Sequence, residues 1–301
     1  MDRILHGMIC DQSIRFVAIS GADIVRTAQS THTLSRVATA ALGRQLMVTS
    51  MIAAQMKNDT DTVTTTISGN GPAGNLVCVG RSGGLVKGYV REPQVELPLR
   101  ADGKLDVRGY VGTHGKLTVI RDLGLKEPYV GLCNLCSGEI AEDFAQYFTA
   151  SEQQPSLVYL GVRERAEDGV VLGAGGLLIQ PLPYCPDAEI SKVEAIASEI
   201  PMLTERLSKG DELEEILNDL FLGLHPEFTK EDAPAFLCDC SRERLETALL
   251  SIGAEELQDI IDTDGQAELT CQFCLKRYHF DREQLKALLN EGLCAGEFDE
   301  E

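Results

Sequence analysis

Four of the ten cysteines stand in two close pairs toward the C-terminal end of the chain. One residue separates Cys238 from Cys240, and two residues separate Cys271 from Cys274. Four thiolates arranged as two close pairs are the donor set of a tetrahedral structural zinc site. The spacing therefore predicts one Zn²⁺ per chain in the reduced form, held by Cys238, Cys240, Cys271 and Cys274.

The predicted metal decides whether the segment around it can fold. Structural zinc contributes about 10–16 kcal/mol in zinc-finger peptides, whereas the core of a domain this small rarely supplies more than about 3–5 kcal/mol. We therefore expect residues 235–292 to unfold when the metal is lost. Oxidation of close cysteine pairs removes thiolate ligands, so oxidant would act as a folding switch. His279 is an alternative ligand, although four sulfurs already close the shell.

The charge of the chain excludes several classes of partner. Acidic residues number 47 and basic residues 27, for a net charge of −20. Nucleic acids and anionic membranes bind surfaces rich in lysine and arginine, so neither is expected as a partner.

The N-terminal segment shows no export signal, because Asp2, Arg3 and His6 interrupt its first apolar run. We therefore expect a cytoplasmic protein.

The chain is expected to have an α+β architecture in three parts. Residues 1–185 alternate strand-like segments with a long helix over 35–57 and a helix capped by Ser137, and they form the mixed sheet-and-helix core. Residues 186–234 form a helical linker, with a break at Pro201 and a helix end at Gly210. Residues 235–301 form a small zinc-binding domain with an acidic tail, in which Ser241 and the Asp281–Gln284 pair cap helices.

The linker carries a broad apolar helical face. Its apolar residues recur at helical spacing, namely Leu213, Ile216, Leu217, Leu220, Phe221 and Leu224. Such a face must be covered in the folded protein, and once uncovered it would offer a binding surface for unfolding proteins. The alternative is an ordinary amphipathic helix that stays packed.

Two other motifs require separate interpretations. Gly69–Gly74 matches the dinucleotide-binding pattern GxGxxG, but a strand rather than a helix should follow it, so we predict a hairpin loop.

Cys133 and Cys136 precede a predicted helix N-terminus, a position that can lower a thiol pKa. They are either a local substitution or an auxiliary redox pair. The isolated cysteines are interpreted as incidental, namely Cys10, Cys78, Cys185 and Cys294.

Longer motifs resemble a known family, the heat-shock protein 33 (HslO) family of redox-regulated chaperones. The resemblance is carried by the two cysteine pairs and by the segments 88–94, 112–117, 137–143, 151–153, 241–246 and 264–268. It extends over nearly the whole chain. Cys133 and Cys136 depart from the family pattern.

The resemblance implies an ATP-independent holdase of the bacterial cytosol rather than an enzyme. It implies that the reduced, zinc-bound form is inactive. Oxidation would form disulfides within each cysteine pair, release zinc, and unfold the zinc domain and linker. The active form, usually a dimer, would hold unfolding client proteins. The alternative function is a thiol-disulfide oxidoreductase that uses Cys133 and Cys136.

Overall fold

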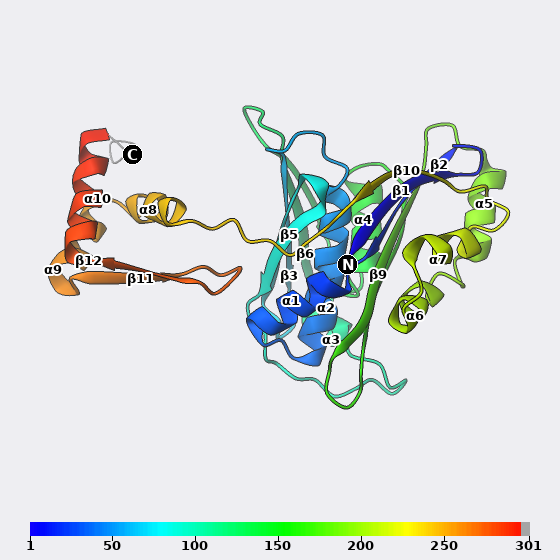
Figure 1. Cartoon of the computed structure of the whole chain (residues 1–301), viewed down its shortest axis with the longest axis horizontal. Helices are drawn as coiled ribbons and strands as arrows, with labels where there is room; N and C mark the ends of the chain where they lie inside the picture. Colours follow the sequence, from blue (N-terminus) through cyan, green and yellow to red (C-terminus); the bar gives the residue numbers. More distant parts are fainter. Residues whose placement is uncertain (296–301) are drawn as a thin grey trace. The chain divides into compact units, whose positions relative to one another are not determined.

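The computed structural model describes residues 1–295, which divide into two compact units. The first unit spans Met1–Leu237 and the second begins at Cys238. The predicted acidic tail and the side chain of Cys294 lie outside the described residues. The observed α+β architecture, with a small C-terminal unit that contains the cysteine pairs, confirms the predicted fold class (Figure 1).

Two antiparallel sheets form the frame of the first unit. One has the order β10-β1-β2-β9-β8 and the other β5-β4-β3-β6-β7. The strands of the first sheet are β1 (Arg3–Ile9), β2 (Ile14–Ser20), β8 (Leu157–Glu164), β9 (Val171–Pro181) and β10 (Glu227–Asp232). Those of the second are β3 (Thr62–Gly69), β4 (Asn75–Arg81), β5 (Leu85–Val90), β6 (Gly115–Asp122) and β7 (Tyr129–Asn134). The loop 70–74 joins β3 to β4 as a hairpin, so the predicted hairpin loop is confirmed.

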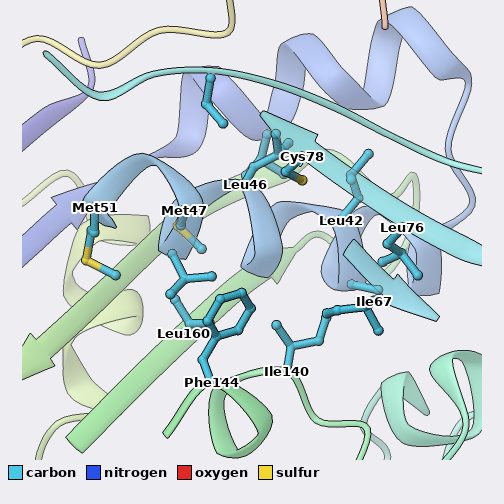
Figure 2. Packing of buried hydrophobic residues seen from close by; sticks show 14 of the residues in the cluster. Leu42, Leu46, Met47, Met51, Ile67, Leu76, Cys78, Ile140, Phe144 and Leu160 are labelled. Atoms are coloured by element: carbon cyan, nitrogen blue, oxygen red, sulfur yellow. The ribbon is translucent and has the colours of Figure 1, made fainter. Parts of the chain in front are cut away.

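The long helix α2 (Arg36–Ala53) is the centre of the main core, because it contacts strands of both sheets. Ser35 caps it by accepting a hydrogen bond from the Ala38 amide at 3.2 Å. Figure 2 shows Leu42, Leu46 and Met47 of this helix among side chains from several neighbouring elements. The remaining helical elements of this part are α1 (Ala22–His32), η1 (Ser82–Gly84), α3 (Val107–Val111) and α4 (Ala141–Ala150).

Three helices cover the other face of the first sheet and enclose a second core. They are α5 (Asp187–Ile196), α6 (Met202–Lys209) and α7 (Leu213–Leu220). Contacts of α6 with β9 and of α7 with β2 attach them to the sheet. The predicted break at Pro201 is present, and Gly210 ends α6 with a φ of +94°, a conformation that glycine adopts readily.

The segment 186–234, predicted as a linker, is part of the first compact unit. Its last portion is the strand β10, which the sequence did not predict and which pairs antiparallel with β1. Arg3 reinforces the pairing through an ion pair with Glu231 at 2.6 Å. The two ends of the first unit are therefore hydrogen-bonded to each other.

The second unit is built around a hairpin of β11 (Gln266–Thr270) and β12 (Arg277–Asp281). Its helices are α8 (Arg242–Leu250), α9 (Ala254–Thr263) and α10 (Arg282–Ala295). Ser241 caps α8, and Asp281 and Gln284 exchange hydrogen bonds at 2.9 and 3.1 Å, so both predicted caps are confirmed. The core is small, with the buried residues Leu249, Leu257, Ile261, Tyr278, Phe280, Leu285, Leu288 and Leu289.

A buried ion pair in the first unit predicts a pH-dependent stability. The Glu164 side chain is 1 % exposed and accepts a hydrogen bond from Arg36 Nε at 3.3 Å, while its Oε1 has no hydrogen-bond partner among residues 1–295. Burial raises the pKa of Glu164 to about 7 from an ordinary 4.5, although Arg36 acts in the opposite direction.

Because the folded state then holds this proton more tightly than the unfolded state, stability falls as pH rises through about 7. The lost free energy of unfolding is on the order of 3 kcal/mol between about pH 4.5 and 7. Urea denaturation of Glu164→Gln at a series of pH values should therefore show a shallower decline than the wild type. Identical slopes would contradict this assignment.

Candidate metal centre

The second unit brings the four predicted cysteines together. Cys238 and Cys240 lie just before α8, and Cys271 and Cys274 lie in the turn between β11 and β12. All four Sγ atoms fall within 4.8 Å of one another. The Sγ atoms of Cys238 and Cys271 are 3.7 Å apart, and those of Cys240 and Cys274 are 3.4 Å apart. The fold thus brings the thiols of two segments that are distant in sequence into contact.

This geometry fits a metal ion of zinc's size. With zinc–sulfur bonds of about 2.3 Å, the sulfurs at the corners of a tetrahedron lie about 3.8 Å apart. The Sγ–Sγ distances of 3.7 and 3.4 Å are close to that value. The turn that carries Cys271 and Cys274 is fixed by backbone hydrogen bonds from Cys271 to Lys276 and from Leu275 to Cys271. The four cysteines can therefore hold one metal ion.

Hydrogen bonding distinguishes the thiols from one another. The Tyr278 hydroxyl lies 3.3 Å from Cys240 Sγ and donates to the Cys240 carbonyl at 3.2 Å. Although burial raises the pKa of Cys240, the hydrogen bonds from Tyr278 and the neighbouring thiols outweigh it and lower this pKa to about 7. Burial is the main cause that raises the pKa of Cys238 and Cys274. A thiolate at Cys240 near neutral pH favours metal binding.

Tyr278 is a site residue that the sequence reasoning missed. It is buried on β12, and the Lys276 ammonium lies 4.8 Å from its ring centroid. The available signal was an aromatic residue at a buried strand position shortly after the second cysteine pair. His279, the alternative ligand, is the next residue and points to the opposite, exposed face of the strand. Among the described residues, the group that could hold a metal ion consists of the four cysteines alone.

The apolar face predicted for the linker is present and fully covered. Its residues are at most 6 % exposed and belong to the second core, namely Leu213, Ile216, Leu217, Leu220, Phe221 and Leu224. The Phe221 ring packs against Phe16 of β2, with 4.9 Å between the ring centroids. The covering surface is the first sheet of the same compact unit.

The Cys133–Cys136 pair does not have the environment that its position in the sequence predicts. Helix α4 begins at Ala141 rather than after Ser137, because Ile140 adopts a left-handed φ of +65°. The buried Asp143 carboxylate accepts the amide hydrogens of Cys136 and Ser137, at 2.8 and 3.0 Å.

The predicted lowering of the thiol pKa at this position is therefore wrong. Burial, together with the nearby Asp143 charge, raises the pKa of Cys133 to about 11. The same two causes raise the pKa of Cys136. The amides that would stabilise a thiolate are already bound to the Asp143 carboxylate. Of the isolated cysteines with described side chains, Cys10 and Cys78 are buried, and Cys185 is partly buried.

No helix among residues 1–295 has both the length and the apolar character needed to cross a bilayer.

Comparisons with known proteins place this architecture in one family. The family model described as Hsp33 protein matches residues 2–281. A 33 kDa chaperonin of Alkaliphilus oremlandii is 45 % identical over 288 residues, which cover 96 % of each chain. A 33 kDa chaperonin of Clostridioides difficile is 43 % identical over 290 residues, which cover 96 % of this chain and 99 % of the relative.

A solved structure agrees with the sequence relatives. The crystal structure of the 33 kDa chaperonin from Thermotoga maritima, a heat shock protein 33 homolog, superposes with a TM-score of 0.85. The two sequences are 38 % identical, and the match covers 97 % of this chain and 99 % of the other. Family model, sequence relatives and fold agree over nearly the whole length, and the chain belongs to the Hsp33 family.

Proposed function

We propose that this protein is an ATP-independent holdase chaperone, inactive in its reduced, zinc-bound form and activated by oxidation. Its membership of the Hsp33 family and the chaperonin names of its relatives support a chaperone rather than an enzyme. The observation that carries the redox part is the group of four thiols, all within 4.8 Å of one another. Cys238, Cys240, Cys271 and Cys274 would hold the zinc, which supplies cross-links that stabilise the fold.

The proposed switch is chemistry of the cysteines themselves. A peroxide takes two electrons from the two thiolates of a pair. One disulfide forms, the O–O bond of the peroxide breaks, and its two oxygens take up two protons from the solvent. We assign the disulfides to Cys238–Cys240 and Cys271–Cys274, the pairs adjacent in sequence. Each disulfide removes two thiolate ligands. The segment that begins at Cys238 then has only its small core to stabilise it.

The proposed client-binding surface is the apolar face of Leu213, Ile216, Leu217, Leu220, Phe221 and Leu224. Because this face is covered within the first unit, activation must also release α7 from β2. The exposed face would then bind apolar segments of unfolding proteins. We further propose a cytoplasmic protein that acts as a homodimer when oxidised, with neither nucleic acid nor membrane as a partner.

Thiol counting combined with zinc analysis tests the switch. Peroxide with mild heat should release one zinc per chain and remove four free thiols, while the chain gains the ability to prevent client aggregation. Reductant with zinc should reverse all three changes. The double variant Cys133→Ser/Cys136→Ser serves as the matched control and should lose the same four thiols. An oxidised protein that gains no holding activity would refute the proposal.

The alternative function, a thiol-disulfide oxidoreductase, has no supporting observation in the structure. The raised pKa of both Cys133 and Cys136 leaves little thiolate at neutral pH. Insulin reduction that disappears in Cys133→Ser would nevertheless establish it.

A further inference from the structure

A cavity of about 440 Å³ lies in the first unit, and the residues that line it are distant in sequence from the two cysteine pairs. Residues from both sheets line it together with the C-terminal end of α2 and the loop that follows. Arg15 comes from β2, Gln180 from β9 and Arg121 from β6. Its volume falls within the range that small-molecule sites occupy.

Two guanidinium groups in this cavity are incompletely paired. Arg15 donates from Nε and Nη2 to the same neutral acceptor, Oε1 of Gln180, at 3.0 and 2.7 Å. It forms no ion pair within residues 1–295. Arg121 forms one ion pair, from Nη2 to Glu152. Nε of Arg121 is buried and has no hydrogen-bond partner in the described part of the chain, and the hydrogen bonds found there for the two guanidinium groups do not use Nη1 of either arginine.

The cavity is locally positive on a strongly acidic protein. Arg15, Lys57 and Arg121 face two carboxylates, Asp61 and Glu152, although the whole chain carries a net charge of −20. The Asp61 carboxylate is already bound by the backbone and side-chain amides of Asn58 at 3.1 Å. Glu152 is thus the one carboxylate of the described lining that pairs with an arginine.

The two arginines also act on each other electrostatically. Burial lowers the pKa of Arg15, the Arg121 charge acts in the same direction, and Glu152 opposes both. A partly buried guanidinium without a carboxylate partner is unfavourable unless another anion is supplied. A bound anion would accept from both Nη1 groups and relieve the repulsion between the two cations.

The remaining lining indicates what such an anion carries. Ile52, Met56, Leu123 and Phe148 contribute apolar surface to the cavity. We propose that this cavity binds a small organic phosphate, with the phosphate against Arg15 and Arg121 and the organic group against the apolar side chains. A phosphate carries close to two negative charges at neutral pH, which matches two guanidinium groups better than a single carboxylate does.

Titration calorimetry of the full reduced chain with phenyl phosphate tests this site. We expect saturable binding of one ligand per chain, tighter than that of inorganic phosphate, and weaker as salt is added. Arg15→Gln should weaken binding at least tenfold, which corresponds to about 1.4 kcal/mol. Arg15→Lys should recover part of the loss, because it restores the charge without the fork of donors.

Arg165→Gln is the matched control, because Arg165 is an exposed arginine outside the cavity that pairs with Asp168. It should leave binding unchanged. Arg121→Gln, with its folding verified by circular dichroism, should weaken binding as Arg15→Gln does. Absence of saturable binding, or equal affinity in the wild type and Arg15→Gln, would overturn the proposal. These binding measurements do not depend on holding activity. The phosphate site and the proposed chaperone function can therefore be refuted separately.

Discussion

Cys271→Ser is expected to unfold the second unit of the reduced protein while the first unit stays folded. Cys271 is the most buried of the four thiols and joins the β11–β12 turn to Cys238 across 3.7 Å. Loss of one ligand removes much of the roughly 10–16 kcal/mol that structural zinc supplies. The small core cannot compensate for this loss, because a core of this size rarely contributes more than about 3–5 kcal/mol to the free energy of unfolding.

Hydrogen exchange with mass spectrometry measures this effect directly. Amides of β11, β12 and α9 should lose protection in Cys271→Ser, whereas those of α2 should keep it, because α2 is buried in a separate core. Treatment of the wild type with a zinc chelator should reproduce the pattern. Cys185→Ser is the matched control, since Cys185 is a cysteine of the first unit and is not one of the four clustered thiols. Preserved protection over 238–295 in Cys271→Ser would show that the metal is not required for the fold.

Phe221→Ala is expected to give holding activity without oxidant. Phe221 is fully buried between α7 and the first sheet, and its ring centroid lies 4.9 Å from that of Phe16. Removal of a buried phenyl ring costs about 3–5 kcal/mol, a large share of the 5–15 kcal/mol that stabilises a typical domain. The helices α5–α7 should therefore detach more often and expose the apolar face.

A second buried phenylalanine separates this effect from general destabilisation. Phe144 is equally buried but belongs to the core around α2 (Figure 2). Phe144→Ala should lower the free energy of unfolding by a similar amount without freeing α7. The readout is aggregation of a heat-denatured client in the presence of each reduced variant. Equal activity of the two variants, or none in either, would exclude the face on α7 as the client-binding surface.

Local signals in the sequence predicted much of this architecture. The spacing of the two cysteine pairs identified the four thiols that the fold brings within 4.8 Å. The caps at Ser241 and Asp281 and the break at Pro201 concern residues only a few positions apart, so a short window contains all the information needed. The apolar periodicity of 213–224 likewise identified which side chains are buried.

Contacts between distant residues were the part that only the tertiary structure decided. No local pattern pairs β10 with β1 across almost the full length of the first unit, and this pairing places the segment 186–234 inside that unit. The pKa of Cys133 was misjudged for the same reason, because the orientation of Asp143 depends on packing. Sequence periodicity fixes which face of an element is apolar, whereas the neighbour that covers it is chosen by long-range packing. The sequence by itself therefore determined which four thiols come together, and the tertiary structure decided what covers the apolar face that these thiols are proposed to control.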